Sequence, residues 1–443
     1  MKIKIILYYT TFIKVILSSY VKIPFNTISP NISSYFSPSE IISRLVENKI
    51  YINISIGTPP QNIPVLLSLQ KTIFSISEGH KQTYCNCYNN ETSISFNKLD
   101  EKVHHLYEKV YDRVYLSTDD IKLNNETKID KMKFVLSLNE DKDYIDCGII
   151  GLSFINELVK SYKNYTFLNE LKQKNIIDKL NFYLIYDTDN SGHIYFGDLP
   201  HEIYLEKYSI NDLIKTNYDT YIYRYNFPFT LIKYGDNILF KNEIVELIYE
   251  ENLMYGPLIY YNLLKQNFFN EQIKLGHCKE DKFGFNSTFF YCNKDTEINK
   301  MENLILFNSN LNYTFILTYE DLFYKVNDIY IFMFYFTLVW AKGFKLGKTF
   351  FKKYNVIFNQ DEKTIAIYKN YKCFEKNGFN YHILIIIFCV IIIIGLFLYI
   401  KYLSPLRKRR IRANELEDQF SYESKSDINK EFEKNKLIED IKI

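Results

Sequence analysis

The sequence predicts an all-β body built as two similar lobes and followed by one transmembrane helix. Short apolar segments separated by turn residues recur between residues 46 and 376, and the uncharged apolar segment 383–400 predicts a transmembrane helix at 382–400. Aromatic residues make up 17% of the chain, almost all of them Tyr and Phe, and such rings suit half-buried strands. The length of 443 residues is enough for two or three domains.

Strand patterns are clearest where apolar residues alternate or flank a polar turn. Residues 50–56 alternate apolar and polar before Gly57-Thr58-Pro59-Pro60, as in a strand that ends in a turn. Two pairs of segments predict β-hairpins, 181–186 with 193–196 and 355–358 with 364–368. A loose apolar stripe predicts one helix, at 166–179.

The two ends of the chain predict its topology. Residues 1–22 carry Lys2 and Lys4 before a short, interrupted apolar stretch, which indicates a secretory signal peptide. The uncharged segment 383–400 would span about 27 Å as a helix, close to the thickness of a bilayer core. Basic residues follow it, namely Lys401, Arg407, Lys408, Arg409, Arg410 and Arg412. Because basic residues favour the cytosolic side, we expect a type I protein of the secretory pathway, with most of the chain lumenal and a cytosolic tail at 401–443.

Seven cysteines fit this placement, since one lies in the predicted span and six precede it. Six cysteines allow 15 pairings; Cys278 pairs plausibly with Cys292 or with Cys373, and Cys85 and Cys87 are expected to bond elsewhere than to each other. A Cys/His metal site is the alternative, although the chain has 7 His and no paired CxxC spacing. Sequons that permit N-glycosylation occur at Asn31, Asn53, Asn90, Asn125, Asn164, Asn286 and Asn312.

Charge limits the partners that the chain can have. Its 54 basic and 52 acidic residues leave a net charge of +2, which gives no concentrated basic face for nucleic acid. We expect no cofactor and no resident metal.

Four segments, taken in order, resemble the pepsin-like (A1) aspartic protease family. They are Tyr51–Leu67, Cys147–Ser153, Phe167–Pro200 and Lys345–Tyr368. The resemblance implies the bilobal pepsin-like fold, with an N-terminal lobe at 46–200, a C-terminal lobe at 201–376 and a possible pro-segment at 23–45. Together with the terminal anchor, it is most similar to the membrane-bound plasmepsin V branch of apicomplexan parasites. It implies a peptide or protein ligand in the cleft between the lobes.

In this family two aspartates, one from each lobe, share a proton and activate a water molecule. The first lies in an Asp-Thr-Gly-Ser motif after an apolar strand. Here that strand leads into Ser68-Leu69-Gln70-Lys71, so Ser68 occupies the aspartate position. A hydroxyl does not ionise near neutral pH, and the resemblance therefore implies a dead first half-site.

The second aspartate should precede Leu253-Met254-Tyr255-Gly256-Pro257, which resembles the stretch after it in the family. Counting back without gaps puts Ile248 at the carboxylate position. Two inserted residues would instead put Glu246 there, one methylene too long. We favour the ungapped alignment, and neither alignment gives a dyad.

Three further positions invite a functional interpretation. Tyr107 stands 12 positions before Asp119, as the family's flap tyrosine does before its following strand, although coincidence explains the spacing equally well. Asp187-Thr188 imitates the start of an active-site motif but lies in a predicted hairpin turn. His104-His105 is expected at the surface.

Three functional hypotheses follow. The favoured one is a non-catalytic, membrane-anchored pseudoprotease that binds peptides or proteins, without peptidase activity. The second is an active aspartic-type endopeptidase that uses a displaced carboxylate such as Glu246. The third is a structural adaptor whose function resides in the anchor and tail.

Overall fold

The computed structural model describes residues 19–28, 32, 36–46, 49–78, 87–102, 114–138, 147–154, 166–204, 206–218, 224–284, 287–337, 344–369 and 410–420. The chain divides into two units, Met1–Tyr371 and Lys372–Ile443. In the second unit the described residues form an exposed helix at 410–420. None of the described helices is both long and apolar enough to cross a membrane. The predicted signal peptide up to residue 18 and the predicted span at 382–400 lie outside the described residues. Residues 19–22, the end of the predicted signal peptide, are described, and Val21 and Lys22 pair with β10 as the start of β1. Retention of the whole of β1 and of Tyr20 therefore requires a signal peptide that ends before residue 20.

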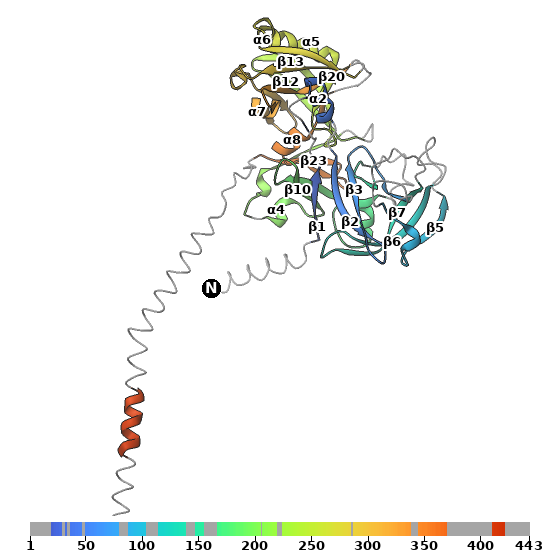
Figure 1. The fold of residues 1–443 in the computed structure, drawn as a ribbon, viewed down its shortest axis with the longest axis vertical. Helices are drawn as coiled ribbons and strands as arrows, with labels where there is room; N and C mark the ends of the chain where they lie inside the picture. The colour runs from blue at the N-terminus through green and yellow to red at the C-terminus, as the bar shows by residue number, and fades with distance from the viewer. Residues whose placement is uncertain are drawn as a thin grey trace, which may run out of the picture. The chain divides into compact units, whose positions relative to one another are not determined.

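The first unit is built on two β-sheets, which form its two lobes (Figure 1). Thirteen strands make the larger sheet, in the spatial order β11-β23-β22-β9-β10-β1-β2-β3-β8-β4-β7-β6-β5. Their bounds are β1 Val21–Thr27, β2 Ile50–Ile56, β3 Gln61–Ser68, β4 Phe74–Glu78, β5 Asn97–Lys102, β6 Val114–Lys122, β7 Lys128–Leu138, β8 Gly148–Gly151, β9 Asn181–Tyr186, β10 Ser191–Phe196, β11 Leu213–Asn217, β22 Ile357–Asn359 and β23 Thr364–Tyr368. Three of these strands, β11, β22 and β23, come from residues 201–376, the predicted C-terminal lobe, so part of that region completes the sheet of the N-terminal lobe.

Ten strands make the second sheet, ordered β15-β16-β20-β14-β21-β13-β12-β17-β18, with β19 paired to β20. Their bounds are β12 Asn226–Tyr234, β13 Asn237–Leu247, β14 Met254–Pro257, β15 Cys278–Phe283, β16 Ser287–Asn293, β17 Leu304–Asn308, β18 Tyr313–Leu317, β19 Phe323–Val326, β20 Ile329–Thr337 and β21 Phe344–Leu346. Buried phenyl rings pack against one another in this lobe; Phe269, for example, stacks on Phe290 with ring centroids 4.2 Å apart. Many of the chain's aromatic side chains thus pack in the core of this lobe.

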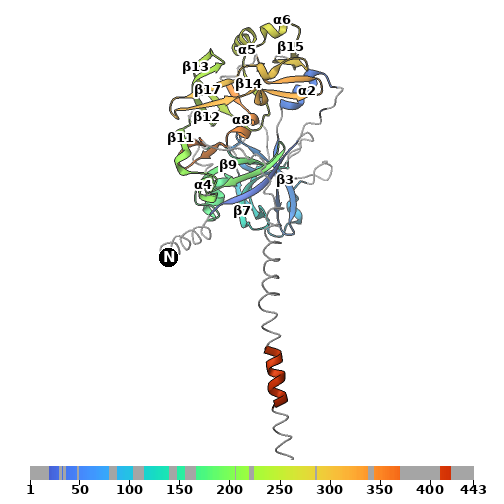
Figure 2. The ribbon, with the colours of Figure 1, turned by 90° about the vertical axis from the view of Figure 1, so that its left-hand side faces the viewer.

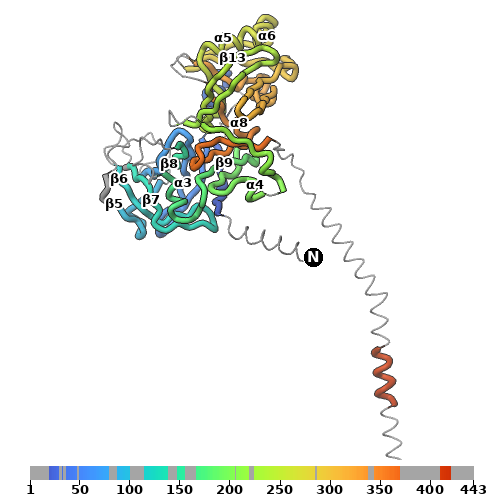
Figure 3. Tube along the Cα trace, turned by 180° about the vertical axis from the view of Figure 1, so that it is seen from behind, coloured from blue at the N-terminus to red at the C-terminus, as the bar shows by residue number. Residues whose placement is uncertain are grey.

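Short helices cover the sheets. They are α2 Pro38–Val46, α3 Phe167–Gln173, α4 Pro200–Ile203, α5 Leu258–Leu264, α6 Asn270–Lys274, α7 Tyr319–Leu322 and α8 Lys348–Lys353. Helix α3 packs beside β7, as Figure 3 shows from behind. It starts where the Thr166 side chain accepts a hydrogen bond from the Asn169 N–H, and it ends before Asn175, whose φ is 55°. The predicted helix at 166–179 is therefore real but shorter than predicted, because a left-handed residue stops it.

The predicted strand at 50–56 and both predicted hairpins are confirmed, as β2, β9–β10 and β22–β23. In β2 the four isoleucines are buried while the residues between them are partly or fully exposed. This alternation is the period-2 pattern that the sequence displays.

The described residues between 21 and 46, most of which fall in the predicted pro-segment, belong to both lobes. Strand β1 lies between β10 and β2 in the larger sheet, with Val21, Ile23 and Phe25 buried. Helix α2 packs against β15 of the second lobe (Figure 2) and buries the face formed by Ile41, Ile42 and Leu45. This segment is an integral part of the described fold.

Two disulfides join described cysteines. Cys278 pairs with Cys292 across the β15–β16 hairpin, which confirms one of the two partners predicted for Cys278. Cys87 pairs with Cys147, the residue before β8. Cys85, Cys373 and Cys389 lie outside the described residues.

Candidate active site

The positions that the sequence singled out lie at the ends of two strands and in the loops that follow them. Ser68 ends β3 and is followed by the loop 69–73, and Glu246 lies near the end of β13, which is followed by the loop 248–253 that begins with Ile248. In each lobe a strand inserts next to the loop: β8 lies between β3 and β4, and β21 lies between β13 and β14. The insertion demands close packing at Gly151, where a Cβ atom would lie 2.4 Å from the Ile73 nitrogen. The sequence segment around Cys147–Ser153 is therefore glycine-containing for a steric reason.

The two loops correspond residue by residue. The carbonyl of Lys71 accepts a hydrogen bond from the Ser153 N–H, and the carbonyl of Glu251 accepts one from the Lys348 N–H, both at 2.8 Å. Counting back three residues from each carbonyl relates Ser68 to Ile248, as in the ungapped alignment. The strand ladders differ by one position, since Ser68 is opposite Gly151 whereas Leu247 is opposite Leu346.

Ser68 is hydrogen-bonded to a carboxylate of the other loop. Its hydroxyl donates to Glu250 Oε1 at 2.7 Å and accepts from the N–H groups of Gln70 and Lys71, each at 3.2 Å. Glu250 Oε1 also accepts from the Gln70 N–H at 3.1 Å. The ungapped alignment pairs Ser68 with Ile248, but the side chain that contacts the Ser68 hydroxyl is that of Glu250, two residues further along.

The Glu250 carboxylate is buried even though part of the residue is exposed. Its Oε2 is shielded from solvent and has no hydrogen-bond partner among the described residues. Burial raises the pKa of Glu250, and hydrogen bonds from Ser68 and from backbone N–H groups offset part of that rise. A buried carboxyl group with one unpaired oxygen is stabilised in its protonated form.

Glu246, the fallback carboxylate, has other partners. Its Oε2 lies 2.8 Å from Arg224 Nη1 and 3.4 Å from Lys345 Nζ. The Glu246 carboxylate therefore lies between two cations, and Glu250 is the carboxylate that contacts Ser68. Ile248 is 1% exposed, and its N–H donates to the Leu346 carbonyl.

Glu251, next to Glu250, is a second carboxyl group with a perturbed titration. Burial is the main cause that raises the pKa of Glu251 to about 7; Lys345 and a hydrogen bond from Tyr335 lower it, and the charges of Glu250 and Glu246 raise it further. The Tyr335 hydroxyl donates to Glu251 Oε2 at 3.2 Å. The loop after β13 therefore holds two neighbouring acidic groups that resist ionisation.

This titration predicts a pH dependence of stability. Below pH 4.5 Glu251 is protonated in both the folded and the unfolded chain, but between pH 4.5 and about 7 only the folded chain keeps the proton. Stability therefore falls as the pH rises through this window, by on the order of 3 kcal/mol. We expect the unfolding free energy of wild type to fall by that amount between pH 4.5 and 7.5, and that of Glu251→Gln, which lacks the titrating group, to lack this fall. Urea denaturation at each pH measures both.

Glu280 supplies the control for this experiment. Hydrogen bonds from Lys265 and Tyr261 lower the pKa of Glu280, so its contribution to stability is lost as the pH falls. The variant Glu280→Gln should show the opposite, smaller trend. A pH-independent difference between wild type and Glu251→Gln would contradict the assignment.

Of the other predicted positions, Tyr107 and His104-His105 lie outside the described residues. Asp187 lies at the start of the turn between β9 and β10, and its Oδ2 is 2.7 Å from His193 Nδ1. Its place in a hairpin matches the interpretation of Asp187-Thr188 as an ordinary turn.

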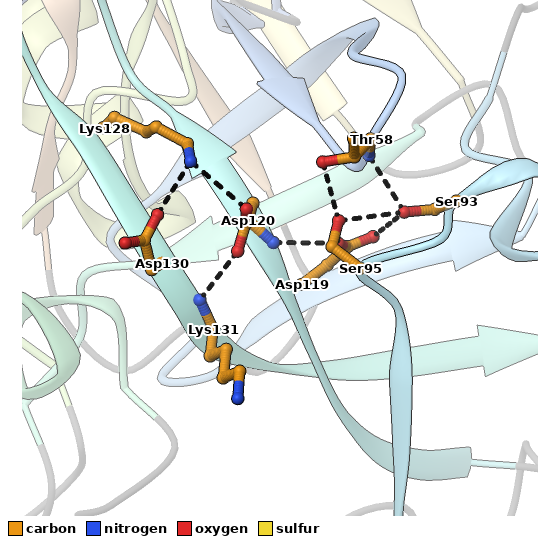
Figure 4. Close-up of polar contacts among 8 residues, drawn as sticks. All are labelled: Thr58, Ser93, Ser95, Asp119, Asp120, Lys128, Asp130 and Lys131. Atoms are coloured by element: carbon orange, nitrogen blue, oxygen red, sulfur yellow. Dashed lines mark hydrogen bonds and ion pairs between the residues drawn. The ribbon is translucent and has the colours of Figure 1, made fainter.

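Asp119 on β6 is completely buried and accepts hydrogen bonds from three hydroxyl groups and one N–H. The donors are Tyr88 (2.5 Å), Ser93 (2.8 Å), Ser95 (2.5 Å) and the Asp120 N–H (2.8 Å). Ser93 and Ser95 also contact Thr58 in the β2–β3 turn (Figure 4). Asp119 thus joins β6 to the segment after Cys87 and to the turn that starts at Gly57.

Comparison with known proteins identifies the family. Residues 49–369 match the eukaryotic aspartyl proteases. The chain belongs to this family. Among solved structures it is similar to conglutin gamma, a basic 7S globulin from lupine seeds, with a TM-score of 0.57, 14% sequence identity, and coverage of 80% of this chain and 96% of that one. No curated protein matches the chain.

As an aspartyl protease family member, the chain has the mostly-β, bilobal pepsin-like fold that the sequence predicted. Its disulfides and its family together indicate the secretory pathway. Sequence reasoning missed Glu250. The signal was present as two adjacent acids, Glu250-Glu251, between the apolar residues Ile248-Tyr249 and Leu253-Met254.

Proposed function

We propose that this aspartyl protease homologue is a non-catalytic peptide-binding protein, a pseudoprotease held at a membrane of the secretory pathway. The observation that supports the proposal is the hydrogen bond between Ser68, which the resemblance puts at the first aspartate position, and Glu250, in the loop that should carry the second aspartate. A hydroxyl and a carboxyl group cannot share one proton as two aspartates do.

The chemistry of the pair supports this proposal. The family's reaction needs one group to take a proton from water and a second to give a proton to the leaving amine. Glu250 can perform one of these steps at a time, and the Ser68 hydroxyl, with an alcohol's high pKa, cannot take over the other. The pair instead connects the two lobes, since its members lie 182 positions apart in the sequence.

Binding does not require the lost carboxylates. Extended peptides are held largely by main-chain hydrogen bonds to neighbouring strands. Both sheets that carry the site keep such strands among the described residues. We place the ligand between the two lobes, near the loops that hold Ser68 and Glu250.

The membrane attachment and the plasmepsin V likeness belong to this proposal. The uncharged segment 382–400 and the basic residues after it support a type I anchor with a cytosolic tail. The order of a secreted body, a Cys-containing segment after the first strands and a terminal anchor supports the plasmepsin V branch.

A second candidate function is peptide hydrolysis through a single carboxylate. The unpaired Oε2 of Glu250 favours it, because that oxygen could hold a water molecule. On this alternative the displaced carboxylate is Glu250 instead of Glu246.

Peptide binding tests the proposal directly. Gln70 has an exposed side chain, while its backbone N–H holds the loop to Glu250. We expect the full chain in detergent to bind a fluorescent peptide pool saturably without cutting it, and Gln70→Trp to weaken binding at least tenfold. The matched control is Asp236→Trp, at the exposed tip of the β12–β13 hairpin, which should bind as wild type does. If neither wild type nor the control binds peptide, the chain is not a peptide receptor.

A further inference from the structure

The loop between β6 and β7 presents a sequon at an exposed tip. Asn125, Glu126 and Thr127 form it, and the side chains of Asn125 and Glu126 are exposed. The preceding residue, Asn124, organises the loop: its Oδ1 accepts hydrogen bonds from the N–H groups of Glu126 (2.9 Å) and Thr127 (2.7 Å). Its Nδ2 donates to the Lys22 carbonyl on β1 at 2.9 Å. The fold therefore fixes the loop and leaves the Asn125 amide free to project outward.

A surface cavity adjoins this tip. Its volume is about 660 Å³, and its lining includes Tyr20, Lys22, Asn53, Asn124 and Asn125. The size is within the range of sites that hold small organic ligands. An aromatic ring with amide and ammonium groups offers the stacking surface and the hydrogen-bond partners that a sugar's faces and hydroxyls require.

The sequon at Asn90 differs in the exposure of its amide and in the contacts of its hydroxyl. Its Oδ1 is shielded from solvent and has no partner among the described residues. The hydroxyl of its third residue, Thr92, donates to the Asn89 carbonyl at 2.9 Å and accepts from Gln61 at 3.1 Å. The amide of Asn90 is thus partly enclosed by the folded chain, and the Thr92 hydroxyl that completes its sequon is held in hydrogen bonds.

Asn53 is exposed, but it lies within a paired strand. It stands opposite Pro64 in the β2–β3 ladder, and the hydroxyl of its sequon's Ser55 donates to Asn62. Because Asn53 lines the same cavity as Asn125, one glycan rooted at Asn125 would cover both positions.

We propose that Asn125 is the site of an N-linked glycan whose first sugars lie in this cavity, and that Asn90 is not modified. The donor is a lipid-diphosphate-linked oligosaccharide. The Asn125 Nδ2 attacks carbon 1 of its reducing sugar, the bond from that carbon to the diphosphate oxygen breaks, and one amide proton leaves with the lipid diphosphate. The reaction requires the lumenal placement that the disulfides and the family indicate.

Site mapping on the full chain from a eukaryotic expression host tests the proposal. Enzymatic release of glycans in heavy-oxygen water converts each modified Asn into labelled Asp, which peptide mass spectrometry locates. We expect label at Asn125 in most copies and none at Asn90. Thr127→Ala, which keeps Asn125 but breaks the sequon, should remove that glycan, whereas Thr92→Ala should leave the glycan pattern unchanged.

An unlabelled Asn125, or label at Asn90 equal to that at Asn125, would overturn the proposal. Mapping of the wild-type chain distinguishes these outcomes even if a variant folds poorly. The result is independent of peptide binding, so the proposed function can fail while the glycan is found, and the reverse.

Discussion

Replacement of Asp119 by alanine is expected to destabilise the chain by about 4 kcal/mol or more. The change leaves three hydroxyl donors and one backbone N–H without their acceptor in a completely buried place. Each buried polar group that loses its partner costs about 1–3 kcal/mol, and loss of a buried network is among the few mechanisms that give such large effects. Chemical denaturation of the purified chain measures the difference.

The neighbouring residue is a matched control for this prediction. Asp120 pairs with Lys128 at 3.3 Å and accepts from the Lys131 N–H at 3.1 Å, and its side chain is 20% exposed (Figure 4). A partly exposed ion pair contributes little, so Asp120→Ala should cost about 1 kcal/mol or less. Equal costs for the two variants would show that the Asp119 network does not stabilise the fold.

Replacement of Phe25 by alanine is the second large effect that we expect. Phe25 lies on β1, is 1% exposed and packs edge-on against Tyr186 with ring centroids 5.1 Å apart. Truncation of a buried Phe to Ala leaves a cavity in the core and costs about 3–5 kcal/mol of stability. The loss should be visible as a lower denaturation midpoint of the full chain purified in detergent.

This variant also tests whether residues 23–45 stay with the protein. Asn26, the next residue on β1, is exposed, so Asn26→Ala should change stability by less than about 0.5 kcal/mol. If maturation removed the segment, neither Phe25→Ala nor Asn26→Ala would change the stability of the mature chain. Mass spectrometry would then find the N-terminus of the mature chain after residue 45. We expect the mature chain to retain β1, because its removal would uncover β10 and β2.

The strands were predictable because their information is local. The alternation in β2 and the turn sequences of the two hairpins depend on neighbouring residues, and the structure reproduces them. The partner of Cys278 was predictable to within two choices, and the hairpin that places it opposite Cys292 decides between them. The end of α3 was not predictable from its apolar stripe, since a single left-handed residue, Asn175, sets it.

The sequence predicts that the aligned positions lack an aspartate, but it does not predict which side chain contacts Ser68. Ser68 could be aligned because it ends an apolar strand with a recognisable partner segment. Glu250 could not, because its contact with Ser68 depends on how two lobes meet across 182 positions. Alignment assigns roles by position, whereas a long side chain can reach a place that a different position occupies in relatives.

Turnover of peptides is the most direct measure of the central statement, that this fold has lost its reaction. Loss of an acid–base unit lowers rates by on the order of 10⁶, so a peptide pool incubated with the wild-type chain between pH 4 and pH 7 should remain uncut, and Glu250→Gln should behave identically. Cleavage that Glu250→Gln abolishes and that a transition-state mimic of peptide hydrolysis blocks would contradict the account.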